Sequence, residues 1–199
     1  MFNATAGLRR AKPDSPDHAA LVAIVQEEAK RLRDIVSDLL EFATPRSPML
    51  SSAPFADVVR GAVDMARTVV GSTLEETVLT LDPEVGQVEC DERLVRQAVV
   101  NLVTNALQTV GRLSAVRVEV AHEAETLEVR VSDDGDGVPV ELRDRIFTPF
   151  FSTRPKGTGL RLAVVRRCAE AHGGEIVLRE TEGGGATFAL QLPRRPARA

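Results

Sequence analysis

The sequence contains few cysteines and no apolar run long enough to cross a membrane. Two of its 199 residues are cysteines, and Cys90 and Cys168 do not stand at the spacing of metal ligands. We therefore expect two buried thiols, because a cytosolic domain of this size needs no disulfide. No segment approaches the roughly 18 apolar residues of a membrane span, and the first residues lack the core of a signal peptide. These absences predict a cytoplasmic protein with no membrane segment in this chain.

The sequence also lacks a strong excess of charge of either sign. Its 25 lysines and arginines nearly balance 29 aspartates and glutamates, which leaves a formal net charge of -4. Such a small charge creates no overall field that would attract nucleic acid or an anionic membrane. Any anion that the protein binds must therefore be held by a local arrangement of groups, and we expect no nucleic-acid partner.

Residues 17–42 have the pattern of a long amphipathic helix. Ser15 can cap its N-terminus, Pro16 suits the first helical position, and Asp17 favours the positive end of the helix dipole. Apolar residues then recur at alternating steps of three and four, at Val22, Val25, Ala29, Leu32, Val36 and Leu39. This heptad seam is typical of helices in bundles. Without a partner helix, its apolar side chains would face water. We therefore expect self-association through helix 17–42.

A stretch rich in proline and serine, residues 45–54, predicts a linker between this helix and the rest of the chain. Beyond it, helical and strand periodicities alternate. Helices are expected at 57–70, 92–110 and 160–172, and strands at 78–81, 88–90, 116–121, 127–132, 175–179 and 186–192. This order predicts an α/β two-layer sandwich, in which a mixed sheet has helices on one face. The domain should span residues 55–193, with a tail at 194–199.

Three polar segments of this domain could bind a ligand, although each alone also has an ordinary structural explanation. Asn101 and Asn105 share one helical face, where amides could bind hydrated Mg²⁺ or phosphate oxygens, or be capping or surface residues. Residues 133–137, Asp-Asp-Gly-Asp-Gly, could admit a flat ligand and bind its amine, or form a plain turn. Residues 156–159, Lys-Gly-Thr-Gly, precede a helix whose N-terminus favours phosphate, or form a plain glycine loop. The last segment is not a Walker A motif.

The three segments occur together in one order, with a pair of phenylalanines before the last of them. An Asn-x-x-x-Asn helix, an Asp-x-Gly-x-Gly loop, the pair Phe150-Phe151 and a Gly-Thr-Gly loop that opens a helix resemble the N, G1, F and G2 boxes of GHKL ATPases. The resemblance is greatest to the catalytic domain of sensor histidine kinases, and it extends from about Phe55 to Pro193. It implies the GHKL fold and the cofactors ATP and Mg²⁺.

The resemblance implies a role for each matched residue. Asn105 would ligate Mg²⁺, and Asn101 stands where relatives that hydrolyse ATP have a catalytic glutamate. An amide cannot act as a general base, so we expect phosphotransfer in preference to hydrolysis. Asp133 would bind the adenine amine, and Lys156 would be the catalytic cation that reaches the phosphates. The other implied ATP-binding positions are Gly135, Gly137, Phe150, Gly157, Thr158, Gly159 and Leu160.

The sequence departs from the family pattern in two places. Arg161 stands where the G2 loop usually has its third glycine, so its side chain could obstruct the nucleotide or contact a phosphate; we expect weakened binding. The second departure concerns residues 1–44, which resemble part of the dimerisation and phosphotransfer domain but lack its phosphoacceptor histidine. His18, His122 and His172 have no acceptor motif around them and are expected to be structural or solvated.

These observations support one leading hypothesis and two alternatives. In the first, the chain is the ATP-binding catalytic portion of a two-component sensor histidine kinase, which transfers the γ-phosphate of Mg-ATP to a histidine on another chain. Its partners would be a phosphoacceptor domain or a response regulator. In the second, it is a degenerate GHKL module that regulates without kinase activity. The third is a trans-acting serine kinase of the anti-sigma type, against which the heptad helix argues.

Overall fold

The structure is a computed structural model, and it describes residues 15–43, 47–70, 78–82, 84–110, 116–123, 125–154, 157–181 and 184–194. The helices are α2 (Pro16–Ala43), α3 (Phe55–Val70), α4 (Glu92–Val110), the 3-10 helix η1 (Val140–Leu142) and α5 (Arg161–Ala171). The strands are β1 (Ser51–Pro54), β2 (Val78–Leu81), β3 (Gln87–Cys90), β4 (Val116–Glu123), β5 (Thr126–Asp133), β6 (Glu175–Glu180) and β7 (Ala186–Pro193). Each predicted helix and strand of the domain is present, with ends that differ by two residues or fewer.

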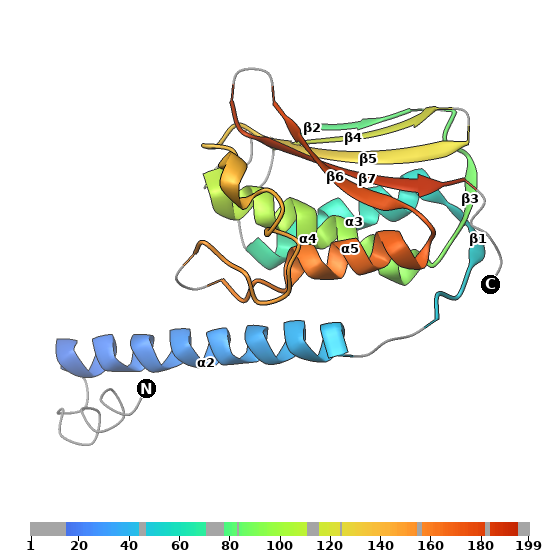
Figure 1. The fold of residues 1–199 in the computed structure, drawn as a ribbon. Coiled ribbons are helices and arrows are strands. Elements are labelled where there is room, and N and C mark those ends of the chain that lie inside the picture. Colours follow the sequence, from blue (N-terminus) through green and yellow to red (C-terminus); the bar gives the residue numbers. More distant parts are fainter. Residues whose placement is uncertain are drawn as a thin grey trace.

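A five-stranded sheet in the order β2-β4-β5-β7-β6 forms one layer of the domain. The β2–β4 pair is parallel and the other pairs are antiparallel, so the sheet is mixed. Helices α3, α4 and α5 cover a single face of it, and α2 lies on the far side of that helical layer (Figure 1). This arrangement confirms the predicted α/β two-layer sandwich preceded by an N-terminal helix.

The core lies between the sheet and its three helices because the apolar periodicities of both meet there. Leu127, Val129 and Val131 alternate along β5 and are completely buried. On the helical side, Val95, Val99 and Leu102 form one stripe of α4 and are also completely buried, among others. A strand has two residues per repeat and a helix 3.6, so each pattern turns one face inward. Cys90 and Cys168 are free and buried in this core, as predicted.

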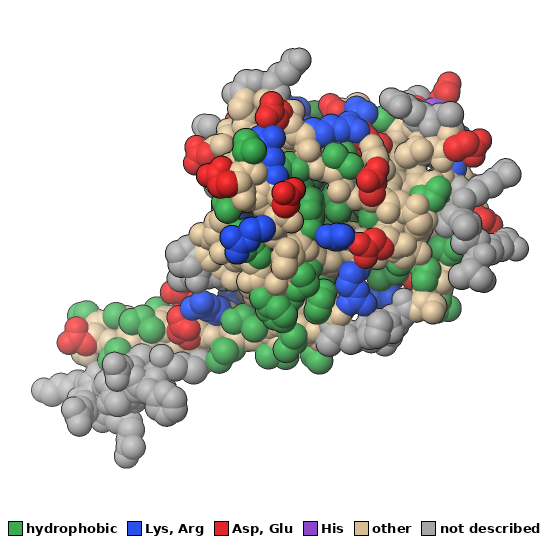
Figure 2. Space-filling model, viewed as in Figure 1, with side chains coloured by type: hydrophobic (Ala, Val, Ile, Leu, Met, Phe, Trp, Pro, Cys, Tyr) green, Lys and Arg blue, Asp and Glu red, His purple; other side chains and the backbone are tan. Residues whose placement is uncertain are grey.

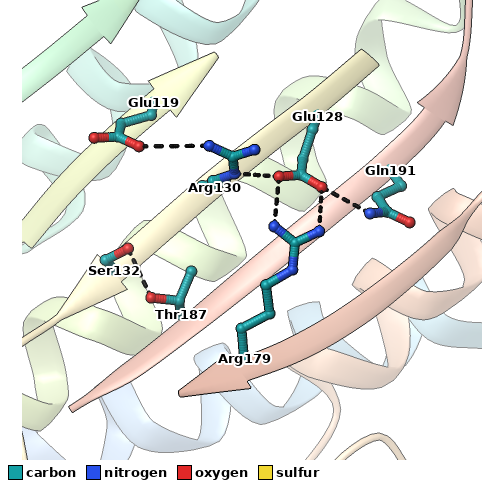
Figure 3. Close-up of polar contacts among 7 residues, drawn as sticks. All are labelled: Glu119, Glu128, Arg130, Ser132, Arg179, Thr187 and Gln191. Carbon is teal, nitrogen blue, oxygen red and sulfur yellow. Dashed lines mark hydrogen bonds and ion pairs between the residues drawn. The ribbon is translucent and has the colours of Figure 1, made fainter. Parts of the chain in front are cut away.

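The opposite face of the sheet has a polar network centred on Glu128 of β5 (Figure 3). Both carboxylate oxygens of Glu128 accept hydrogen bonds from Arg179 of β6, at 2.9 and 2.7 Å. Gln191 of β7 donates a third at 2.7 Å, and Arg130 of β5 donates a fourth. The network joins three neighbouring strands, so polar contacts hold this face of the sheet together.

The junction between β3 and α4 is organised by Asp91. Its carboxylate caps α4 by accepting from the backbone N–H of Leu94 at 3.1 Å, and it also accepts from the N–H of Met49 at 2.9 Å. The backbone N–H of Asp91 donates to Nε2 of the buried His172, 2.9 Å away. His172 therefore has a structural position in this fold, next to the end of α5. Part of the predicted linker at 45–54 is structured as well, because Ser51–Pro54 forms β1 and pairs with β3.

Helix α2 begins as predicted, with Oγ of Ser15 accepting from the N–H of His18 at 3.2 Å. At its other end, Phe42 packs edge-on against Phe150 and under the guanidinium of Arg167. Its predicted seam stays largely exposed, with Leu32, Val36 and Leu39 between 43% and 51% accessible. Hydrophobic side chains are visible along α2, including the end that projects past the domain (Figure 2). None of the described helices combines the length and apolar character that a membrane crossing requires.

Candidate nucleotide-binding site

A cavity of about 680 Å³ lies between α4, the loops that follow β5 and precede α5, and residues 27–38 of α2. Its volume is typical of sites for small-molecule ligands and cofactors. The predicted site residues that line it are Asn105, Asp133, Gly137, Gly157, Thr158 and Gly159. The tertiary structure thus brings the three polar segments of the sequence to one place.

The other predicted residues lie around the cavity or outside the described part of the chain. Gly135 is in the loop after β5 but does not line the cavity, and Leu160 is buried directly before α5. Asn101 is buried one helical turn before Asn105 and does not reach the cavity wall. Lys156 falls outside the described residues. The roles predicted for these residues remain predictions.

Asp133 forms the buried end of the cavity. It is the last residue of β5 and only 2% exposed, and its Oδ1 accepts from the N–H of Gly135 at 3.0 Å. Burial raises the pKa of Asp133, and the backbone hydrogen bonds from Gly135 and Ala186 offset this only in part. A carboxyl that has lost much of its hydration gains from an N–H donor brought by a ligand. The position is therefore suited to recognise an amine at the end of a flat ring.

The loop after Asp133 is held by direct backbone packing. Gly137 has φ +74°, and a Cβ there would lie 2.8 Å from the carbonyl oxygen of Gly185. Gly185, with φ +90°, would in turn place a Cβ 1.9 Å from the carbonyl oxygen of Asp133. Gly185 was not among the predicted site residues, although the run of three glycines at 183–185 was a signal for such a close approach.

The two loops that precede α5 are clamped together at Gly159. This residue has φ +67°, and a Cβ on it would lie 2.5 Å from the carbonyl carbon of Phe150 and 2.5 Å from the oxygen of Phe151. The N–H of Phe150 donates to the carbonyl oxygen of Gly159 at 3.0 Å. Phe150 itself has φ +65°, an uncommon conformation for a residue with a side chain. This packing fixes the start of the lid, the segment that follows Phe151 and whose residues 152–154 line the cavity.

The two phenylalanines face different surroundings. Phe151 lines the cavity and has the guanidinium of Arg145 4.4 Å from its ring centroid. Phe150 is 66% exposed, and its ring lies 6.3 Å from that of Phe42, centroid to centroid. In this structure Phe150 therefore joins the lid to α2, while Phe151 contributes to the cavity wall.

Asn105, the second of the two predicted asparagines of α4, has a side chain that could bind a cation. Asn105 lines the cavity, and within the described chain its side-chain amide has no hydrogen-bond partner. That amide oxygen is thus available to a cation such as Mg²⁺, which prefers oxygen ligands and retains several waters. No group of three or more acidic, histidine or cysteine side chains suited to a metal is present among the described residues. The residues present therefore fit a metal ion that arrives with its ligand better than a permanently bound one.

Arg154 and Arg161 occupy the cavity beside Asn105, and neither was among the predicted site residues. Arg154 donates to the carbonyl oxygen of Asn105 at 3.2 Å, to Oε1 of Gln108 at 3.2 Å and to Oγ1 of Thr109. Arg161 donates to the same Gln108 oxygen at 2.7 Å. Burial lowers the pKa of Arg154, as does the neighbouring charge of Arg161. The sequence alone indicates that Arg161 could obstruct the nucleotide or contact a phosphate, but the position of its guanidinium depends on the fold.

Helix α2 closes the remaining side of the cavity. Its lining residues are Glu27, Lys30, Arg31, Ile35 and Asp38. Oδ2 of Asp38 accepts a hydrogen bond from the Thr158 hydroxyl at 2.6 Å, so α2 is bonded directly to the glycine loop. Only the fold could reveal this contact, because the two residues are 120 positions apart.

Sequence comparison matches this chain to known kinases. The family model for histidine kinase-, DNA gyrase B- and HSP90-like ATPases matches residues 90–196, more than half of the chain. The sensor histidine kinase ZraS of Escherichia coli (strain K12) is 32% identical over 173 residues, 87% of this chain and 37% of ZraS. The signal transduction histidine-protein kinase AtoS of the same strain is 29% identical over 188 residues, 94% of this chain and 31% of AtoS. The chain therefore spans about a third of the length of these relatives.

Solved structures agree with the sequence matches. Full-length ShkA in complex with AMPPNP has a TM-score of 0.74 at 25% identity, covering 98% of this chain and 43% of ShkA. The catalytic domain of the histidine kinase ThkA has a TM-score of 0.66 at 26% identity, covering 74% of this chain and 97% of that domain. ThkA in complex with the response regulator TrrA covers the whole chain with a TM-score of 0.79, but its 23% identity supports the fold alone.

The matched residues begin at the end of β3 and include α4, the loop after Asp133 and the Gly157–Gly159 loop, which line the cavity together with α2. The sheet order, the cavity and the sequence matches therefore lead to the same assignment. The chain belongs to the family of histidine kinase-, DNA gyrase B- and HSP90-like ATPases and is homologous to the sensor histidine kinases.

Proposed function

We propose that this chain is the catalytic portion of a two-component sensor histidine kinase, which binds Mg-ATP and transfers its γ-phosphate to a histidine supplied by another chain. The observation that supports this most is the meeting of Asp133, Asn105 and the Gly157–Gly159 loop around one cavity of nucleotide size. Asp133 would receive the adenine amine, and the glycine loop at the start of α5 would receive the phosphates.

The positions of the histidines support an acceptor on another chain. The sequence has three histidines. His172 is 1% exposed and accepts from the N–H of Asp91, while Nδ1 of His122 lies 2.8 Å from Oδ2 of Asp82. His18 is in the first turn of α2, and none of the three lines the cavity. A phosphoacceptor would therefore have to be brought to the cavity by a partner.

The chemistry that these residues support is transfer by positioning. Phosphoryl transfer needs charge neutralisation and an in-line approach more than covalent participation of the protein. Mg²⁺, when bound with ATP, would neutralise phosphate charge, and the amide oxygen of Asn105 would hold it there. Asn101 and Asn105 are amides and cannot deprotonate water, which disfavours hydrolysis. Lys156 is proposed as a further cation for the phosphates.

The proposed partners are a phosphoacceptor domain, a response regulator and a second copy of this chain. ThkA, which shares the fold, was crystallised with the response regulator TrrA, and the relatives named above are sensor kinases. The second copy would bind through the exposed seam of α2, at Leu32, Val36 and Leu39. A two-stranded or larger bundle would bury these side chains.

Calorimetric titration with Mg-ATP tests the nucleotide site. The parent protein should bind, and Asp133→Asn should lose most of the affinity because the adenine amine loses a charged acceptor. Asp134→Asn is the matched control, since the next residue is an exposed aspartate outside the cavity and should leave binding unchanged. Equal losses in the two variants would contradict the assignment of Asp133.

Incubation of the protein with radiolabelled ATP and an isolated phosphoacceptor domain tests the transfer. We expect acid-labile, base-stable label on the acceptor domain and none on this chain. Mg-ATP binding without any transfer would favour the regulatory module without kinase activity. Acid-stable label on a serine would favour a serine kinase.

A further inference from the structure

Arg154 and Arg161 come from different segments, yet their guanidinium groups converge on one atom. Oε1 of Gln108 accepts from Arg161 at 2.7 Å and from Arg154 at 3.2 Å. Gln108 lies one turn beyond Asn105 on α4, so the two cations stand at the end of the cavity where the Mg²⁺-binding asparagine is proposed. Both arginines also line this cavity.

Within the described residues, the positive charge of this pair is not matched by an ion pair. The hydrogen-bond acceptors of the two side chains are all neutral: a glutamine oxygen, a threonine hydroxyl and a backbone carbonyl. Arg161 is also the first residue of α5, where the helix dipole disfavours a positive charge. The buried Asp133 carboxylate acts on Arg154 only electrostatically, with no hydrogen bond or ion pair between them among the described residues. Two adjacent cations balanced only in this way remain unfavourable unless an anion joins them directly, so the arrangement is better explained by a ligand than by stability.

We propose that Arg154 and Arg161 form a clamp for the terminal phosphate of a nucleoside triphosphate and so make the site prefer ATP to ADP. This inference rests on the proposed function of the cavity. A guanidinium matches two phosphate oxygens at once, which an ammonium cannot do. Arg161 stands where the resembling G2 loops have a glycine, and its side chain reaches across the cavity to Gln108 of α4. The clamp reverses the expectation from the sequence that Arg161 weakens binding.

The clamp works by exchange of hydrogen bonds. The bonds from Arg154 to Asn105, Gln108 and Thr109 are released when the γ-phosphate arrives, and phosphate oxygens replace these neutral acceptors. ADP lacks the terminal phosphate, so it leaves the two guanidiniums in their present positions and gains little from them. The α- and β-phosphates depend on the glycine loop and are the same in both nucleotides.

The experiment compares the dissociation constants of Mg-ATP and Mg-ADP, measured by calorimetry, for the parent protein and for Arg161→Gln, Arg161→Gly and Arg154→Gln. Each variant should bind ATP at least about tenfold more weakly, the effect of losing a charged hydrogen bond, and ADP about as well as before. Arg161→Lys should bind ATP more tightly than Arg161→Gln but more weakly than the parent. Lysine keeps the positive charge but cannot donate two parallel hydrogen bonds to one phosphate. Arg166→Gln is the matched control, since that arginine pairs with Glu170 on α5 and does not line the cavity.

Several outcomes would overturn the clamp. Tighter ATP binding by Arg161→Gly would show that the side chain obstructs the site. Equal losses for ATP and ADP would show a general structural or electrostatic effect, and a thermal melt of each variant separates misfolding from it. A parent protein that binds neither nucleotide would refute the proposed function and the clamp together. A parent that binds both, with variants whose ATP-to-ADP preference is unchanged, would refute the clamp alone.

Discussion

Replacing Glu128 by glutamine should lower the free energy of unfolding by about 1–3 kcal/mol. The Glu128 side chain is 10% exposed and accepts four hydrogen bonds, from Arg179 twice, from Arg130 and from Gln191. Hydrogen bonds to a charged group each contribute roughly 1.5–3 kcal/mol. Arg130 and Arg179 are 31% and 41% exposed and would regain hydration in the variant, so only a fraction of the sum is lost.

The loss should depend on pH in a defined direction. Burial alone would raise the pKa of Glu128. The hydrogen bonds from Gln191, Arg130 and Arg179 lower the pKa by more than burial raises it, so the net shift is downward from 4.5. A carboxyl with a lowered folded-state pKa stabilises the fold fully above its ordinary pKa of 4.5 and loses this contribution as the pH falls through the folded value. The difference in the free energy of unfolding between parent and variant should therefore be complete at pH 7. It should shrink once the pH falls below the pKa of the carboxyl in the unfolded state.

Urea denaturation followed by circular dichroism, from pH 7 down to the most acidic pH at which the protein stays folded, measures this difference. Glu119→Gln is the matched control, because Glu119 is 46% exposed and lies 4.0 Å from Arg130. That substitution should change stability by less than about 0.5 kcal/mol. The reasoning would be refuted if the two substitutions had equal effects at pH 7, or if the effect of Glu128→Gln did not diminish in acid.

Three further predictions concern the site and its helix. Gly159→Ala should destabilise the fold by more than about 1 kcal/mol and weaken Mg-ATP binding, because φ +67° and the nearby lid backbone leave no room for a Cβ. Asp38→Ala should raise the affinity for Mg-ATP by up to about tenfold in calorimetry, since it frees the Thr158 hydroxyl from α2. Val36→Lys should shift sedimentation equilibrium toward monomer, because it places a charge in the exposed seam of α2.

Each of these predictions has a control in the same chain. Gly86→Ala should be tolerated, because a Cβ there meets nothing within 4 Å. Equal destabilisation by Gly159→Ala and Gly86→Ala would contradict the close packing of the lid backbone around Gly159. Gln26→Ala changes an exposed residue of α2 outside the cavity, and Asp38→Ala should differ from it. Met65→Lys changes an exposed apolar residue of α3 and should leave association unaltered. A parent protein that is monomeric at micromolar concentration would contradict self-association through α2.

Secondary structure was predictable because its causes are local. Residues 92–110 form α4 as expected, since the spacing of Val95, Val99 and Leu102 fixes one face of a helix and Asp91 can cap it without help from distant segments. The linker was harder, because Ser51–Pro54 becomes a strand only through pairing with β3 (Gln87–Cys90), which lies more than 30 residues further along the chain. A strand of four residues has too few side chains to show its periodicity.

The motifs likewise located most of the cavity wall but not all of its charges. Gly137 and Gly159 were predictable because a positive φ strongly favours glycine, so a glycine in a loop marks such a position before the rest of the fold is known. Arg154 was missed because a single arginine in a lid has no pattern, and only packing places it against Asn105, 49 residues earlier.

By itself, the sequence determined the family, the order of helices and strands, and the glycine loops, because each depends on residues close together in the chain. The tertiary structure alone decided which distant groups meet. Arg179 reaches Glu128 from 51 residues away, Arg161 reaches Gln108 from 53, and Asp38 bonds to a hydroxyl 120 residues ahead. Long flexible side chains reveal no partner until the backbone is packed, because one charge in a sequence is compatible with many neighbours.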